Sequence, residues 1–160
     1  TNEELYLYWL SKDHFRHATY DSYKYSLDGL RRDPTDIRIN NAYGLLLLKR
    51  GYFTESRKFF EAAIKKVTRS NPNPYDSEPY FNLGLSLFYS GDMNGAYDAF
   101  YKSAWTSACC ESAFYYLAAI SARRKDYELA LEHAENAIIK NGRNYKALGI
   151  KTYILRTLGR

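Results

Sequence analysis

Two histidines and one aspartate have a spacing that could form a metal site. His14 and His17 lie three positions apart, and Asp21 follows four positions later, so a helix would bring these side chains to one face. Imidazole nitrogens and a carboxylate oxygen are ligands that zinc accepts. However, no cysteine or further histidine joins them, because His133 belongs to a distant part of the chain. An exposed pair of histidines is the simpler interpretation, and we expect no metal or other cofactor.

The two cysteines do not indicate redox chemistry. Cys109 and Cys110 are adjacent, and neighbouring cysteines rarely close an unstrained disulfide. Two reduced, partly buried thiols are expected, which fits a cytoplasmic location. The sequence also lacks a P-loop, a nucleophile elbow and a Ser/His/Asp set. We therefore expect no enzymatic activity.

The composition is that of one folded domain. The chain has 160 residues, of which 46% are hydrophobic and 17% aromatic, and this length allows a substantial buried core. No apolar run approaches the roughly 20 residues that a membrane span needs, so no membrane association is expected. The chain begins at Thr1 without a methionine, and we expect it to be a fragment of a longer protein.

The net charge of +5 is compatible with a nucleic acid as the binding partner. The basic residues are dispersed in pairs along the chain, and several lie where helix ends are expected, so they also fit a solvated surface with a mild cationic bias. Tyrosines could stack bases between these cations. Single-stranded RNA therefore stays open as a disfavoured alternative.

The elements that must carry any site follow a sequence repeat. A small residue recurs at one position of a helical pattern, at Gly44, Gly84 and Ala118, at spacings of 40 and 34 residues (84 − 44 and 118 − 84). Stepping 34 residues outward from the first and last markers reaches Leu10 and Thr152, which also lie among apolar positions. Five markers fall in phase once a single insertion of six residues is allowed.

That insertion is the stretch SNPNPYDSEPY, residues 70–80. A boundary between two domains would reset the phase at random, whereas here the phase returns after six residues. Asn and Pro end the preceding helix near Ser70, Asp76 or Ser77 can cap the next helix, and Pro79 is tolerated in its first turn. The stretch is therefore predicted to be a loop on one continuous array.

This pattern resembles the tetratricopeptide repeat, a helix–turn–helix unit of 34 residues, across essentially the whole chain. The resemblance implies a single all-α domain, a right-handed superhelical solenoid of about four and a half repeats. Small residues such as Gly84 would let paired helices approach, and Phe60 and Phe100 would fill the space between pairs. The expected units are 3–36, 37–76 with the insertion, 77–110, 111–144 and the half unit 145–160. The expected helices are 3–13, 18–31, 36–49, 53–68, 77–90, 93–107, 111–124, 127–140 and 144–158.

A narrower resemblance concerns two segments, DPTDIRINNAYGLLLLKRG and NPNPYDSEPYFNLGLSL. They are similar to the repeat region of large, uncharacterised bacterial proteins in which the array follows a β-rich domain of unassigned function. This resemblance implies a bacterial source and an upstream domain, and it brings no activity with it.

In arrays of this family the first helix of each unit lines a concave face, which implies a protein or peptide partner. Asn82 is expected to anchor a peptide backbone, because an amide donates and accepts at once. Aromatic side chains would supply contact area at little entropic cost. The expected groove residues are Arg38, Asn41, Lys49, Phe81, Asn82, Tyr89, Tyr115, Tyr116, Arg123 and Lys146.

The carboxylate clamp of chaperone-binding arrays does not fit this sequence. The clamp positions of the second to fourth units are occupied by Asn41, Leu45, Asn82, Ser112 and Tyr116, and only Asn82 matches the pattern. We therefore favour a non-catalytic scaffold that holds a peptide segment or neighbouring domain in its groove. A structural array that packs on the upstream domain is the alternative.

The last expected helix, 144–158, is apolar around much of its circumference. The end of a repeat array needs a polar outer face, but this helix carries Leu148, Ile150, Tyr153, Ile154, Leu155 and Leu158. We expect this surface, bared by truncation, to mediate self-association with another copy. Polar substitutions at Ile150 and Ile154 would then weaken the association without changing helicity.

Overall fold

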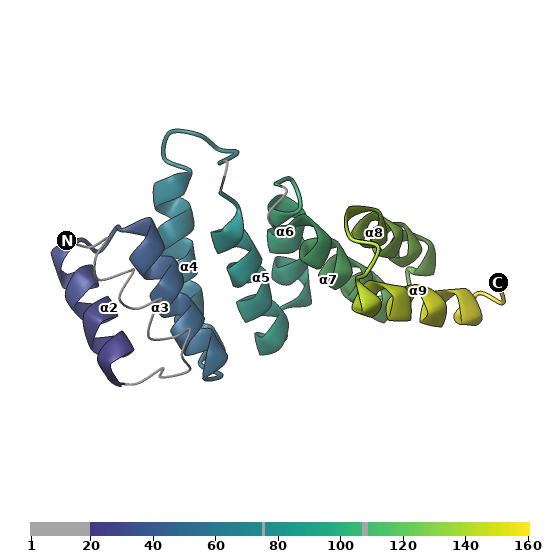
Figure 1. The fold of residues 1–160 in the computed structure, drawn as a ribbon, viewed down its shortest axis with the longest axis horizontal. Coiled ribbons are helices and arrows are strands. Elements are labelled where there is room, and N and C mark those ends of the chain that lie inside the picture. Colours follow the sequence, from purple (N-terminus) through teal and green to yellow (C-terminus); the bar gives the residue numbers. More distant parts are fainter. Residues whose placement is uncertain (1–19, 75, 107–108) are drawn as a thin grey trace.

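The computed structural model describes residues 20–74, 76–106 and 109–160, and within these ranges every regular element is a helix (Figure 1). The helices follow one another along the long axis of the molecule, each packed on the next. This confirms the all-α solenoid expected from the sequence. His14 and His17 lie outside the described residues. The helices are α2 (Tyr20–Arg32), α3 (Ile37–Lys49), α4 (Phe53–Val67), α5 (Glu78–Ser90), α6 (Met93–Ser103), α7 (Cys110–Arg123), α8 (Tyr127–Lys140) and α9 (Tyr145–Thr157).

Short turns fold the helices into antiparallel pairs, α3 with α4, α5 with α6 and α7 with α8. Gly51 and Gly91 in the first two of these turns have φ of 85° and 96°, a backbone region that favours glycine. Four of the described helices begin after a residue whose side chain accepts a hydrogen bond from the backbone N–H three positions later, which satisfies a free donor of the first turn. These N-caps are Asp36, Asp92, Asp126 and Asn144.

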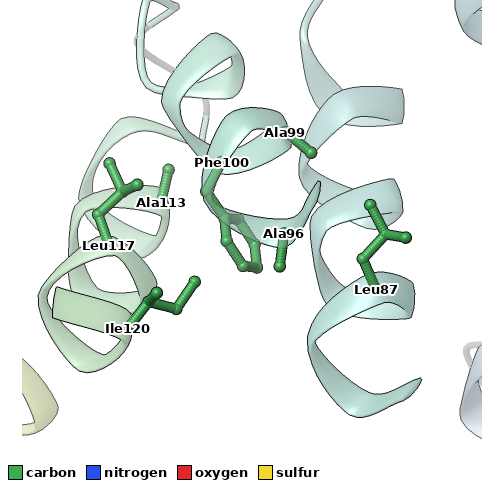
Figure 2. Packing of buried hydrophobic residues seen from close by; sticks show 7 residues of the cluster. All are labelled: Leu87, Ala96, Ala99, Phe100, Ala113, Leu117 and Ile120. Atoms are coloured by element: carbon green, nitrogen blue, oxygen red, sulfur yellow. The ribbon is translucent and has the colours of Figure 1, made fainter. Parts of the chain in front are cut away.

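The small residues of the repeat allow each helix pair to close. A Cβ atom placed on Gly44 would lie 2.6 Å from the Phe60 ring, and one on Gly84 would lie 2.7 Å from the Phe100 ring. Phe100 is fully buried, and Figure 2 shows it among the side chains of α5, α6 and α7. The predicted roles of these glycines and phenylalanines in packing are therefore confirmed.

A buried polar contact links the α3–α4 pair to the α5–α6 pair. The hydroxyls of Ser56 on α4 and Ser86 on α5 lie 3.0 Å apart, and each also lies within 2.8 Å of the carbonyl oxygen of Phe53. Both serines are buried. Because these groups satisfy one another away from water, α4 and α5 are held in one register.

The insertion forms the long connection between α4 and α5. Ser77 is the N-cap of α5, and Pro79 lies in its first turn, as the sequence predicts. The Ser77 hydroxyl donates to the carbonyl oxygen of Ser103 at 3.0 Å and contacts the hydroxyl of Thr106. The insertion therefore returns onto the end of α6.

Two expectations need correction. We expected α6 to run to residue 107, but it ends at Ser103. The backbone N–H groups of Trp105 and Thr106 donate to carbonyl oxygens three positions back, which is the pattern of a turn and not of an α-helix. We also expected Ile154 on an exposed face of α9, but this side chain is fully buried. A polar residue at Ile154 would therefore disrupt the core. The exposed apolar side chains of this helix are Tyr145, Leu148 and Tyr153.

No helix in the described part of the chain is both long enough and apolar enough to cross a membrane.

Candidate binding groove

A hollow of about 490 Å³ lies between α5, α7 and the start of α9. Phe81 and Leu85 of α5 form one wall, and Ser112, Tyr115 and Tyr116 of α7 form the other. The turn before α9 closes one end with Asn141, Arg143, Asn144, Tyr145 and Lys146. We call this hollow the groove.

The groove exists because α5 and α7 stand apart. Among the described helices, α3 packs beside α5 and α7 packs beside α9, whereas α5 and α7 meet mainly through their side chains. The Tyr116 ring stacks on Phe100 with a centroid distance of 4.7 Å, and it also contacts the Phe81 and Phe88 rings edge-on. These large rings hold the two helices at a distance and form the floor between them.

Tyr116 is also tied to the neighbouring Tyr89. Their hydroxyl oxygens lie 3.4 Å apart, and Tyr89 stacks on the ring of Phe53 with a centroid distance of 5.5 Å. Burial, followed by the contact with Tyr89, raises the pKa of the Tyr116 hydroxyl above its ordinary value. Tyr116 therefore stays neutral and acts as a fixed part of the groove.

The charged side chains that line the groove differ in their exposure to solvent. Lys146 and Arg143 are exposed at the rim, and the Lys146 ammonium lies 5.8 Å from the centroid of the Tyr115 ring. Glu111 is only partly exposed, and its Oε2 atom is buried with no hydrogen-bond partner among the described residues. The groove thus has cations at its edge and a glutamate in its lining, one of whose carboxylate oxygens is covered by protein atoms.

The two asparagines expected to face a ligand are engaged with each other. Asn82 Nδ2 donates to Asn41 Oδ1 at 2.9 Å, and Asn41 Nδ2 donates to Glu78 Oε1 at 3.0 Å. Asn82 is 4% exposed and Asn41 is 9% exposed. The amides therefore link α3 to α5 across 41 positions of sequence.

The structure brings together four of the residues expected in the groove, namely Phe81, Tyr115, Tyr116 and Lys146. Tyr89 adjoins them through Tyr116. The remaining three lie elsewhere. Arg123 lies 5.0 Å from the Phe88 ring at the end of α7, Lys49 lies exposed at the end of α3, and Arg38 lines a separate hollow beside the end of α4.

Sequence reasoning missed Glu111, Asn141, Arg143 and Tyr145 as groove residues. Glu111 has the sequence position of an acid in the first turn of a helix, where it complements the helix dipole without any further role. The other three lie in or next to a turn, outside the helical repeat used to choose candidates. Only the packing of α9 beside α7 brings them to the groove.

The reactive groups of the described residues do not gather in the groove. His133 is buried, and its Nε2 atom lies 2.9 Å from the Tyr97 hydroxyl, between α8 and α6. Burial, with a smaller effect from nearby carboxylates, raises the pKa of the Cys109 thiol to about 11. A thiol that stays protonated at neutral pH is a poor nucleophile. Neither His133 nor Cys109 lines the groove.

The fold is similar to that of several solved structures. A chain of the APC/C hetero-tetramer Cut9–Hcn1 matches with a TM-score of 0.85 and 16% identity, over 97% of this chain and 30% of that one. MamA matches with a TM-score of 0.80 and 16% identity, over 93% of this chain and 83% of that one. A thermophilic TPR protein of Thermus thermophilus matches with a TM-score of 0.70 and 13% identity, over 97% of this chain and 81% of that one.

At these identities the similarity concerns the fold alone, and it confirms the tetratricopeptide-like helical repeat expected from the sequence. No protein-family model matches the chain. The present chain spans less than a third of the Cut9–Hcn1 chain that it matches.

Proposed function

We propose that the chain is a non-catalytic interaction scaffold, and that it holds a peptide segment of another protein or of a neighbouring domain in the groove between α5, α7 and α9. The observation that carries this proposal is the hollow of about 490 Å³ with its aromatic walls. Tyrosine and phenylalanine side chains supply large contact areas at low entropic cost, which is why they are frequent at binding hot spots.

The rigidity of the groove supports the same function. Its rings are fixed by Phe100, Phe88 and Tyr89 before any ligand arrives, and a surface that is already ordered loses little entropy on binding. Several cations outside the groove lie over aromatic rings of the array itself, such as Arg124 over Tyr97. This arrangement favours a peptide over a nucleic-acid strand, which needs free cations along a continuous track.

A selection experiment tests the proposal. A displayed library of random linear peptides is selected on the wild-type protein, and the enriched peptides are then tested against Ser112→Trp. Ser112 lines the groove and is partly exposed, so an indole at this position fills the hollow. Thr54→Trp is the matched control, because Thr54 is an exposed residue of the first turn of α4.

The proposal predicts peptides that bind the wild type and Thr54→Trp equally and do not bind Ser112→Trp. Circular dichroism checks that all three proteins are equally helical. A selection that yields no peptides, or peptides that bind Ser112→Trp as tightly as the wild type, would contradict the proposal.

A further inference from the structure

From the groove we infer the chemistry of its ligand: the bound segment inserts an arginine side chain, whose guanidinium pairs with the carboxylate of Glu111. This inference rests on the proposed function and goes one step further, from a peptide to the residue that the groove selects. The group that the groove selects is therefore cationic and planar.

The position of Glu111 is the first reason. Glu111 lines the groove, and its Oε2 atom, which protein atoms cover, has no hydrogen-bond donor from any described residue. A buried carboxylate oxygen without a partner is unfavourable, and removing this deficit makes the binding of a donor favourable. A charged donor gains the most, because hydrogen bonds between ions are about twice as strong as neutral ones.

The neighbouring rings are the second reason. Tyr115 follows Glu111 by four positions on α7, so both side chains lie on one face of the helix. The Tyr115 ring already accepts a cation, since the Lys146 ammonium lies 5.8 Å from its centroid. A guanidinium that reaches Glu111 along α7 therefore passes aromatic rings that favour a positive charge.

Arginine fits better than lysine for a geometric reason. The guanidinium is planar, stacks on aromatic rings and presents two parallel N–H groups to a carboxylate, whereas an ammonium is a compact and strongly hydrated point charge. Lys146 and Arg143 at the rim carry the same charge as the guanidinium of the ligand and repel it. Both side chains are exposed, so solvent and salt weaken this repulsion. They also favour an acidic residue next to the arginine in the ligand.

The test uses a peptide from the selection described above that requires an open groove. Three versions are synthesised, with arginine, with citrulline as its neutral equivalent and with lysine at the same position. Their dissociation constants are measured by calorimetry on the whole 160-residue chain. The proteins are the wild type, Glu111→Gln and the control Glu55→Gln, in which Glu55 is an exposed acid of α4.

We expect arginine to be enriched among the selected peptides, and its replacement by citrulline or lysine to weaken binding to the wild type about tenfold or more. Glu111→Gln should lose a similar factor for the arginine peptide and should no longer distinguish arginine from citrulline. Glu55→Gln should behave as the wild type.

Two results would overturn the inference while leaving the proposed function intact. One is a set of groove-dependent peptides without enriched arginine. The other is a preference for arginine over citrulline that is the same in Glu111→Gln as in the wild type. An absence of groove-dependent peptides would contradict the proposed function as well.

Discussion

At the scale of single residues, the packing of α5 against α6 depends on the absence of a side chain at Gly84. A methyl group at this position would lie 2.7 Å from two ring carbons of Phe100, a side chain that is itself fully buried. At this distance the ring or the backbone must shift inside a buried core. Gly84→Ala should therefore lower the free energy of unfolding by about 1–3 kcal/mol, as overpacking does in other cores. Urea unfolding followed by circular dichroism measures the change.

Gly149 provides the control for this substitution. It also lies inside a helix, α9, but a methyl group there would meet nothing within 4 Å. Gly149→Ala should raise the free energy of unfolding by up to about 1 kcal/mol, because alanine is the better helix former. Equal effects of the two substitutions would show that Gly84 is not a packing residue.

His133 should make the stability depend on pH. Burial lowers the pKa of His133 below its ordinary value of 6.5, so the folded state favours the neutral ring. As the pH falls below about 6.5, the unfolded chain binds a proton first. The contribution of His133 to stability is therefore complete above this pH and is lost as the pH falls toward its folded pKa.

The substitution His133→Phe tests this dependence. Phenylalanine keeps an aromatic ring beside Tyr97 and Phe114 and does not titrate. The free energy of unfolding should then change less between about pH 7.5 and about pH 5.5 than in the wild type. An unchanged pH profile would mean that other groups cause the dependence.

Residues differ in how far the sequence predicts their role. The packing role of Gly84 is predictable from the repeat. A glycine also occupies the equivalent position 44, and a phenylalanine follows each glycine by the same spacing, at Phe60 and Phe100. The role of Asn82 is harder to predict, since its partner Asn41 is 41 positions away and the contact appears only when α3 packs beside α5. The position of Glu111 in the groove lining likewise depends on the neighbouring helices.

At the scale of elements, four of the described helices start after a capping side chain. The cap of α9 also shapes the groove, since Asn144 lines it and accepts a hydrogen bond from the backbone N–H of Ala147 at 3.0 Å. Asn144→Ala should cost about 1 kcal/mol of stability. It should also speed amide exchange in the first turn of α9. Asn144→Asp, which keeps the accepting oxygen, should stay close to the wild type, and equal exchange in both variants would contradict the role of the cap.

One helix end was predicted less well than the helix starts. The start of α5 at Glu78 follows from Asp76, whose side chain accepts a hydrogen bond from the Glu78 backbone N–H, and from a proline in the first turn, both visible in the sequence. The end of α6 at Ser103 lies four residues before the expected one, because the backbone N–H groups of Trp105 and Thr106 donate to carbonyl oxygens three positions back. Local signals therefore identify the start of α5, whereas the turn that ends α6 carries no glycine or proline that would mark it in the sequence.

At the scale of the whole molecule, the repeat predicts the array because each helix pair must bury its apolar face against its neighbours. The division into repeat units stays a prediction from the sequence period. The groove is a departure from that regularity. It forms where the rings of Phe81, Phe88 and Tyr116 keep α5 and α7 apart. A sequence period cannot indicate such a local difference in spacing.

Peptide binding in the groove is tested most directly by amide hydrogen exchange of the whole chain with and without a peptide selected on it. If the groove binds the peptide, exchange should slow in α5, in the first turns of α7 and at residues 141–146. Exchange in α4 and α6, which do not line the groove, should be unchanged. Slower exchange confined to α6 and the connection 68–77, where Trp105 borders a different hollow, would contradict the account.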